Sequence, residues 1–482
     1  MMCSLGELGL PPASHADSPQ SQGRGRTPAS GNRSAPCGED HGRESGVDTL
    51  AFESVEQPEP PKIRTIQARN YRCLRHVDVR LDNRFYVVVG PNGSGKSTLF
   101  DAIEFIFDLF NNGLKAAIEA RTRNFQDLVW ARPKESPGFE LAAEFDVADQ
   151  TFRYEVKVEE ERGCGVRIVR EAGYLGGLSA EAFAKLASSD TTLDNLAEGD
   201  LRPAFRRTRR GRTEDCWTTF HSERHGDTLT LHHPDDTSGI RYLGLVDQLA
   251  AEKGDKRKRR RFNMPVSTAT AAQLTETRPV QLLQLDSRAL RKPAARNGDD
   301  GRRMTEDGSN LPRVVDNLSR DKARWSHWMG HIRTAIPAIR NIRSVHREED
   351  RSDYLMIRYA NGTEIPAWGI SEGTLRLLAL TILPYLPGRQ PAAYLLEEPE
   401  NGIHPMAIEL AYQSLSSIYG SQVFIASHSP TFLRCIKPRE VLCFSQDADG
   451  GAVIVRGDEH PTLAKWQGSM NDDLFFAPDV LG

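Results

Sequence analysis

The stretch "GPNGSGKST", Gly90 to Thr98, stands between two apolar runs. The run that enters it, "RFYVVVG", is short and rich in β-branched residues, which predicts a buried strand. The run that leaves it, "STLFDAIEFIFDLF", predicts a helix, because four apolar residues share one face: Leu99, Ile103, Ile106 and Phe107. Strand, glycine-rich loop and helix in this order indicate a phosphate-binding loop.

The loop fits the pattern GxxxxGK[ST] in full. Its glycines permit the positive φ angles that aim consecutive N–H groups inward, and the helix N-terminus adds partial positive charge. Lys96 can reach the β- and γ-phosphates of a nucleotide, and Ser97 can offer its hydroxyl to Mg²⁺. The predicted nucleotide-binding residues of the loop are Gly90, Pro91, Asn92, Gly93, Ser94, Gly95, Lys96, Ser97 and Thr98.

Two further apolar strands are expected to end in polar side chains. In "YLLEEPENGIHP", Glu397 is the predicted second Mg²⁺ ligand beside Ser97, and Glu398 can polarise a water in line with the γ-phosphate. In "FIASHSP", the strand ends in Ser427 and His428, and a neutral imidazole there can contact the γ-phosphate or the attacking water. Glu398 and His428 are therefore the predicted catalytic residues. The alternatives are an exposed strand end for the carboxylates and a satisfied polar residue for the histidine.

A second anion site is predicted where "GISEGTLRLL" begins a helix at Ser371 and Gly373. The chain thus has two anion-binding helix starts, one after the glycine-rich loop and one at Ser371, but only one nucleotide-binding loop. Dimerisation would explain the second helix start. The helix of one chain would then cap the nucleotide held by another, so we expect a homodimer with the nucleotide at its interface.

Strands and helices alternate through the chain, which predicts an α/β core with a mainly parallel sheet. A hairpin is expected from residue 138 in "GFELAAEFDVADQTFRYEVKVE", and another in "DYLMIRYANGTEIPAW" that turns at Asn361-Gly362. The segments "LPRVVDNL" and "WMGHIRTAIPAIRNI" are expected to be helices. We expect a disordered tail over residues 1–60, two halves of the core over 61–175 and 306–482, and a basic, partly flexible insertion over 176–305.

These motifs together resemble the ABC-type ATPase heads of the RecF/SMC-like group, and within it the compact prokaryotic AAA-family ATP-binding proteins without a long coiled coil. The resemblance covers residues 62–160 and 305–446. Its motifs are the leading strands in "IQARNYRCLRHVDVRL", the segment "DGSNLPRVVDNL", the signature in "ISEGTLRLLAL", the Walker B motif and D-loop in "LLEEPENGIHP", and the switch histidine in "IASHSP".

The resemblance implies two heads that sandwich two ATP molecules with Mg²⁺. It implies that Glu397 organises Mg²⁺ and that Glu398 is the catalytic carboxylate. It also implies that Ser371 and Gly373 contact the γ-phosphate held by the partner.

Asn401 and His404 would lie in a loop that faces the dimer partner. The sequence departs from the family where Glu397 replaces the usual aspartate and where Glu372 replaces a glycine. The glutamine of the Q-loop is not evident, and Gln126 in "RNFQDLVW" is a candidate.

Composition excludes several classes of protein. The 482 residues carry a net charge of −4, with 38% hydrophobic residues, and no run approaches the roughly 18 apolar residues of a membrane helix. The seven cysteines show no zinc-like spacing, which favours free thiols in a reducing, cytoplasmic compartment.

The basic runs "RPAFRRTRRGR", Arg202 to Arg212, and "KGDKRKRRR", Lys253 to Arg261, have three readings. They can bind a nucleic-acid backbone, form a solvated loop, or act as a nuclear import signal. No aromatic stripe accompanies them, so the sequence does not support base-specific recognition of DNA.

The sequence thus predicts an ATP hydrolase that dimerises around ATP and acts in DNA maintenance, DNA repair or anti-phage defence. The alternative is a regulatory module that hydrolyses ATP slowly and gates a separate effector protein, such as a nuclease. A transporter ATPase is disfavoured by the signature and by "EEPENGIHP".

Overall fold

The computed structural model describes residues 59–130, 137–147, 150–161, 165–187, 201–209, 216–221, 228–233, 238–241, 273–275, 279–295, 300–388, 390–461 and 463. The predicted tail lies outside these residues except for its last two positions. The basic run Lys253 to Arg261 lies wholly outside them.

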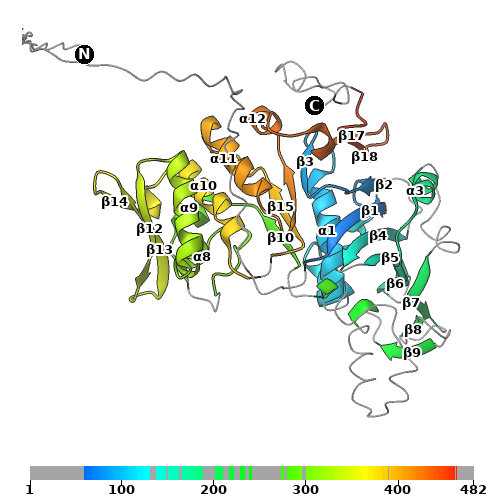
Figure 1. The fold of residues 1–482 in the computed structure, drawn as a ribbon. Helices are drawn as coiled ribbons and strands as arrows, with labels where there is room; N and C mark the ends of the chain where they lie inside the picture. The colour runs from blue at the N-terminus through cyan, green and yellow to red at the C-terminus, as the bar shows by residue number, and fades with distance from the viewer. Residues whose placement is uncertain are drawn as a thin grey trace, which may run out of the picture. The chain divides into compact units, whose positions relative to one another are not determined.

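Six strands of the described residues form the central sheet, in the order β10-β15-β16-β3-β17-β18. Neighbouring strands are parallel except for the last pair, which is antiparallel. The expected α/β fold with a mainly parallel core sheet is therefore confirmed (Figure 1). The strands are β3 (Phe85–Val89), β10 (Val280–Leu283), β15 (Ala393–Glu397), β16 (Gln422–Ala426), β17 (Val441–Gln446) and β18 (Ala452–Arg456).

The register of this sheet brings three predicted motifs to one edge. Glu397 of β15 pairs with Ala426 of β16, and Ala426 pairs with Val88 of β3. Because the three strands are parallel, their carboxyl ends lie at the same edge, where ligands bind in open α/β sheets. The loops that follow the three strands therefore start side by side.

Strand β3 is apolar throughout because it is buried on both faces. Tyr86 and Val88 belong to one hydrophobic core, whereas Val87 and Val89 belong to a second core. Successive side chains of a strand point to opposite faces, so an unbroken apolar run is what two cores require.

The first core lies between the central sheet and an eight-stranded antiparallel sheet of the described residues, with α1 (Lys96–Asn112) between the two (Figure 1). Aromatic rings of α1 contact rings of that sheet: the centroids of Phe110 and Tyr154 are 4.6 Å apart. The sheet has the order β2-β1-β4-β5-β6-β7-β8-β9. Its strands and the two nearby short helices are β1 (Lys62–Tyr71), β2 (Leu74–Arg80), β4 (Gly138–Val147), β5 (Gln150–Glu161), β6 (Gly165–Leu175), β7 (Arg202–Arg209), β8 (Cys216–His221), β9 (Thr228–His233), α2 (Leu114–Glu119) and α3 (Ala180–Ala187).

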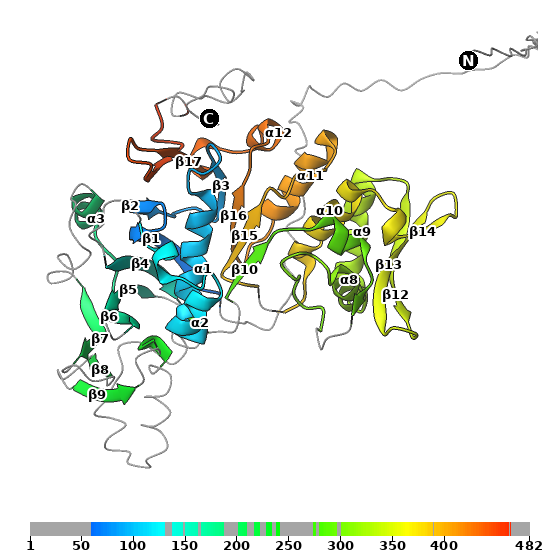
Figure 2. The ribbon, with the colours of Figure 1, turned by 180° about the vertical axis from the view of Figure 1, so that it is seen from behind.

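The second core lies on the other face of the central sheet. On this side, helices lie between the central sheet and a small antiparallel sheet (Figure 2). The small sheet has the order β11-β13-β12, and β14 also pairs with β13. The elements of this side are α7 (Ser287–Arg291), β11 (Ala294–Ala295), α8 (Leu311–Ser319), α9 (Lys322–Ala335), β12 (Ile339–Arg347), β13 (Ser352–Tyr359), β14 (Glu364–Pro366), α10 (Glu372–Thr381), α11 (Pro405–Ser416) and α12 (Pro430–Leu433).

The hairpin predicted at Asn361-Gly362 is confirmed, since β13 and β14 pair around a turn in which Gly362 has a φ of 85°. The helix predicted over "WMGHIRTAIPAIRNI" is wrong in its second half. Helix α9 ends at Ala335, and the residues from Ile339 form strand β12. Pro337 disfavours a helical conformation at the residue before it, so the helix ends there.

The range predicted as one insertion, 176–305, contains strands of both large sheets. Arg202–Arg209 is β7, paired with β6, and Val280–Leu283 is β10, paired with β15 in the central sheet. The core therefore resumes before residue 306. The segment "VQLL" is too short for its apolar periodicity to be recognised, and only its pairing with β15 makes it a strand.

Candidate nucleotide-binding site

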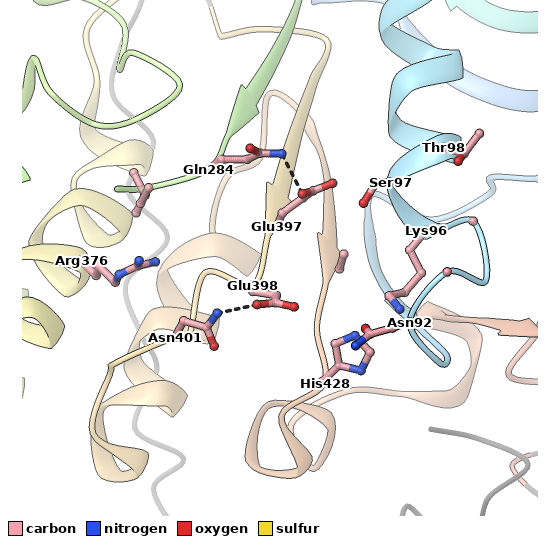
Figure 3. Close-up of a pocket in the computed structure, with 14 residues that line it drawn as sticks. Asn92, Lys96, Ser97, Thr98, Gln284, Arg376, Glu397, Glu398, Asn401 and His428 are labelled. Carbon is pink, nitrogen blue, oxygen red and sulfur yellow. Dashed lines mark hydrogen bonds between the residues drawn. The ribbon is translucent and has the colours of Figure 1, made fainter. Parts of the chain in front are cut away.

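A cavity of about 440 Å³ lies at the edge where β3, β15 and β16 end. Polar residues from six elements or their following loops line it (Figure 3). Its lining consists of Asn92, Gly93, Gly95, Lys96, Ser97, Thr98, Gln284, Leu285, Arg376, Glu397, Glu398, Asn401, Ala426 and His428. The structure thus brings both predicted carboxylates, the predicted histidine and all of the predicted loop residues except Gly90, Pro91 and Ser94 to the lining of one cavity.

The glycines of the loop meet both a conformational and a steric requirement. Gly90 has a φ of 143°, and a Cβ atom on it would lie 2.2 Å from the carbonyl oxygen of Phe444. Gly95 has a φ of 106°, and its Cβ would lie 2.9 Å from the sulfur of Cys73. The loop is therefore held tightly against β17 and the turn between β1 and β2, as only glycine permits.

Lys96 is buried at the centre of the loop. Its ammonium donates hydrogen bonds to the carbonyl oxygens of Gly90 (2.7 Å) and Pro91 (2.9 Å). Burial lowers the pKa of Lys96, while the negative charges of Glu398 and Glu397 raise it. Gly90 and Pro91 thus serve the site through their carbonyl groups, although neither lines the cavity.

Glu397, the last residue of β15, faces Ser97 across the cavity (Figure 3). Its carboxylate accepts a hydrogen bond of 2.7 Å from the side-chain amide of Gln284. A hydroxyl and a carboxylate from two facing elements form the all-oxygen donor set that Mg²⁺ prefers. The residues predicted to hold the metal therefore fit it.

Glu398 has an unusual backbone conformation. Its φ is 44°, in the left-handed region, and its N–H donates a hydrogen bond of 2.8 Å to the carbonyl oxygen of Ala426. Its carboxylate accepts a hydrogen bond from the side-chain amide of Asn401. Such backbone strain in a residue other than glycine clusters at functional sites.

His428 follows β16, is half-buried, and reaches the cavity beside Lys96 and Asn92 (Figure 3). Burial lowers the pKa of His428, the Lys96 ammonium lowers it further, and Glu398 raises it. The imidazole is thus kept in its neutral form at pH 7, in which it can accept or donate a hydrogen bond.

The predicted second anion site lies apart from this cavity. Ser371 is exposed and begins α10, and its hydroxyl accepts a hydrogen bond of 3.3 Å from the N–H of Thr374. Neither Ser371 nor Gly373 belongs to the residues that line the cavity of its own chain. Gly373 packs instead on the next loop, since a Cβ on it would lie 2.2 Å from the carbonyl oxygen of Gly402.

Two residues of the D-loop resemblance also differ in position. Asn401 lines the cavity and bonds to Glu398, whereas His404 is exposed and begins α11.

The glutamine of the site is Gln284, and the proposed Gln126 is elsewhere. The side-chain amide of Gln126 bonds to Glu160 at 2.6 Å, and Gln126 lines a different hollow. Gln284 directly follows the short strand β10, whereas Glu397 ends β15, and a polar residue at the end of a strand is the only signal that the sequence offers for Gln284. Arg376 of α10 also lines the cavity, and the sequence had given no reason to select it.

Two family models of ATPase domains match this chain. Residues 271–434 match the family described as "AAA domain, putative AbiEii toxin, Type IV TA system", and residues 62–181 match the family described as "AAA ATPase domain". The two matches together span more than half of the chain and include the loop from Gly90 to Thr98, both cavity carboxylates and His428.

Solved structures similar to this chain include heads of SMC proteins. An SMC head bound to the C-winged helix domain of ScpA is 14% identical, with a TM-score of 0.46, and the likeness covers 82% of this chain and 97% of that one. The SMC head domain from Thermotoga maritima is 11% identical, with a TM-score of 0.38, over 82% of this chain and 98% of that one.

The fold and the site define a P-loop ATPase. The two family matches support the compact RecF/SMC-like P-loop ATPase that the motifs predicted. Among the described residues, no helix combines the length and hydropathy needed to cross a membrane.

Proposed function

We propose that this protein hydrolyses ATP at a composite site, in which Ser371 of one protomer closes over the nucleotide held by the loop of another. The observation that supports this most is the separation within one chain. Lys96, Glu397, Glu398 and His428 share a cavity, whereas the exposed start of α10 at Ser371 lies outside it. A second copy would complete the site.

Each cavity residue has a part in this proposal. Lys96 and the loop N–H groups bind the phosphates, and Ser97 with Glu397 would hold Mg²⁺, which neutralises charge on the β- and γ-phosphates. Glu398 orients the attacking water and accepts its proton, and the neutral His428 imidazole contacts the γ-phosphate.

We further propose that the ATP cycle serves anti-phage defence or DNA maintenance. The description of one matched family names a putative toxin of a toxin–antitoxin system, which supports defence. A DNA backbone remains the proposed partner of the basic segment from Lys253 to Arg261. Turnover measured with single-stranded, double-stranded and no DNA across a salt series tests this, because phosphate contacts weaken steeply with salt.

A slow, regulatory ATPase is the second candidate, and one observation favours it. The cavity groups of this chain bond to one another or to their own loop: Lys96 to Gly90 and Pro91, and Glu398 to Asn401. Turnover would then begin only after these bonds are exchanged for bonds to the nucleotide. A separate effector protein, such as a nuclease, would in that case perform the downstream chemistry.

Mixing two inactive variants tests the composite site. Lys96→Ala lacks the phosphate lysine, and Ser371→Arg blocks the cap while leaving its own loop intact. In a mixed dimer, one site combines the intact loop of the second chain with the intact Ser371 of the first, so we expect turnover to reappear on mixing. Thr334→Arg, at another exposed helical position, should stay active alone. A mixture as inactive as its components would contradict the composite site.

A further inference from the structure

Glu400 is a buried carboxylate between the loops that follow β15 and β16. It is 8% exposed and lies two residues beyond Glu398, outside the set of residues that line the cavity. Its side chain reaches the other loop, where its Oε1 atom accepts a hydrogen bond from the hydroxyl of the fully buried Ser427.

The loop that contains Ser427 also carries His428. Burial raises the pKa of Glu400, while the hydroxyl of Ser427 and the backbone N–H groups of His428 and Ser429 lower it. The hydrogen bond of the carboxylate is to Ser427, so it holds the residue directly before His428. Ser427 also receives a hydrogen bond of 3.1 Å at its hydroxyl from the N–H of Ser429, which closes the loop around it.

The first loop is fixed at the same place. The N–H of Ile403 donates a hydrogen bond of 2.9 Å to the carbonyl oxygen of Glu400, and the N–H of Asn401 donates one of 3.1 Å to that of Glu398. The backbone of Glu400 thus belongs to the turn that carries Glu398, while its side chain holds the turn that carries His428.

We propose that Glu400 is a positioning residue, which binds the loop after β16 to the loop after β15 and thereby holds the His428 imidazole in the cavity opposite Glu398. The proposal rests on the proposed function for the role of His428 in turnover. It assigns to Glu400 no contact with the nucleotide.

Glu400→Gln is the informative substitution because it keeps the size of the side chain. A carboxylate only accepts hydrogen bonds and is charged, whereas a glutamine amide is neutral and exchanges one accepting oxygen for an NH₂ donor. The charge-assisted bond to Ser427 is then replaced by a weaker neutral one, so the loop after β16 is held less firmly. Glu409→Gln is the matched control, since Glu409 is exposed on the following helix α11 and accepts a hydrogen bond of 3.3 Å from Gln413.

The first measurement is a double-mutant cycle on ATP turnover. We expect Glu400→Gln to lower kcat at least about tenfold with KM unchanged, because a displaced catalytic group costs rate. In a His428→Ala background, the same substitution should cost less than about twofold, since residues that act through one another are not additive. An equal loss in both backgrounds, or a rise in KM that follows a loss of thermal stability, would overturn the proposal.

The second measurement needs no hydrolysis. The imidazole signals of the nucleotide-free protein are recorded by NMR, and His428 is assigned as the signal that disappears in His428→Ala. Glu400→Gln, or Ser427→Ala if the first variant does not fold, should move that signal, whereas Glu409→Gln should not. An unmoved signal refutes the positioning role. Wild-type turnover that does not depend on Lys96 refutes the proposed function instead, and the imidazole signal still decides the role of Glu400.

Discussion

Gln284 donates a hydrogen bond of 2.7 Å to the carboxylate of Glu397, and the two residues lie next to each other because Leu283 pairs with Leu396 in the parallel register. The edge strand β10 therefore supports the residue that ends the neighbouring strand. One oxygen of Glu397 is held by this bond, which fixes the direction in which the carboxylate faces Ser97.

Gln284→Ala is expected to weaken the metal site without removing a predicted ligand. Partners that orient a ligand cost about 10- to 100-fold in metal affinity when they are removed. The Mg²⁺ concentration for half-maximal ATP turnover should rise by that order. Wild-type Gln126 bonds to Glu160 outside the cavity, so Gln126→Ala should leave this Mg²⁺ concentration unchanged. Equal Mg²⁺ requirements in the two variants would contradict the assignment.

Lys96→Ala is expected to abolish ATP binding, because it removes the ammonium that the phosphate-binding loop holds in the cavity. Titration calorimetry measures the loss directly. Lys115→Ala removes an exposed lysine of α2 that pairs with Glu119, and it should bind ATP as the wild type does. Unchanged binding in Lys96→Ala would place the nucleotide elsewhere.

Glu398→Gln is expected to bind ATP but to lose turnover by about 10²- to 10⁴-fold, the range that a general base supplies. Because ATP then persists at the interface, the variant should accumulate as a dimer. Light scattering with and without MgATP measures this mass, with the exposed Glu409→Gln as control. A monomer in the presence of ATP would count against a nucleotide-bridged dimer.

Turnover is expected to fall on acidification through the pKa of His428. Burial and the Lys96 ammonium lower this pKa below its ordinary value of 6.5, so the folded chain binds this proton less readily than the unfolded chain does. Stability and activity that depend on the neutral ring are thus complete above 6.5 and are lost as the pH falls through the lowered pKa. In a pH profile of kcat, His428→Ala should lack this acidic limb while keeping a low, flat rate. The same limb in the variant would assign it to another group.

Arg207→Ala is expected to destabilise the fold rather than to weaken nucleic-acid binding. The guanidinium of Arg207 pairs at 3.1 Å with the fully buried Glu171. Removing one partner of a buried ion pair costs about 3–5 kcal/mol of unfolding free energy, measured by denaturant titration. Arg206→Ala, at the adjacent exposed position, should change it by less than about 0.5 kcal/mol. If Arg207→Ala weakened DNA binding and left the stability unchanged, the result would favour binding of a nucleic-acid backbone by the run Arg202 to Arg212.

The sequence alone predicted those site residues that directly end or follow an apolar strand. The loop from Gly90 to Thr98, Glu397 with Glu398, and His428 each follow such a strand, and the parallel register of three neighbouring strands collects them. The same local logic predicted the hairpin at Asn361-Gly362, since two residues determine that turn.

The parts that could not be predicted depend on distant pairing. Strand β10 is four residues long and belongs to the core only because β15, more than a hundred residues later, pairs with it. Gln284 was missed for that reason. Arg207 likewise reads as one more charge in a basic run, and its buried partner Glu171 comes from another strand.

The close approach of Gly373 to the carbonyl of Gly402 has a consequence for the order of events in a dimer. The start of α10 would touch one ATP, and the loop at Gly402 continues into the turn that carries Glu398 beside the other ATP. Because Gly373 has no side chain, its backbone lies directly against that of Gly402, so a movement of either segment would displace the other. Hydrolysis at the two ATP sites of such a dimer would then be cooperative. The turnover of one ATP would depend on whether the other site is occupied.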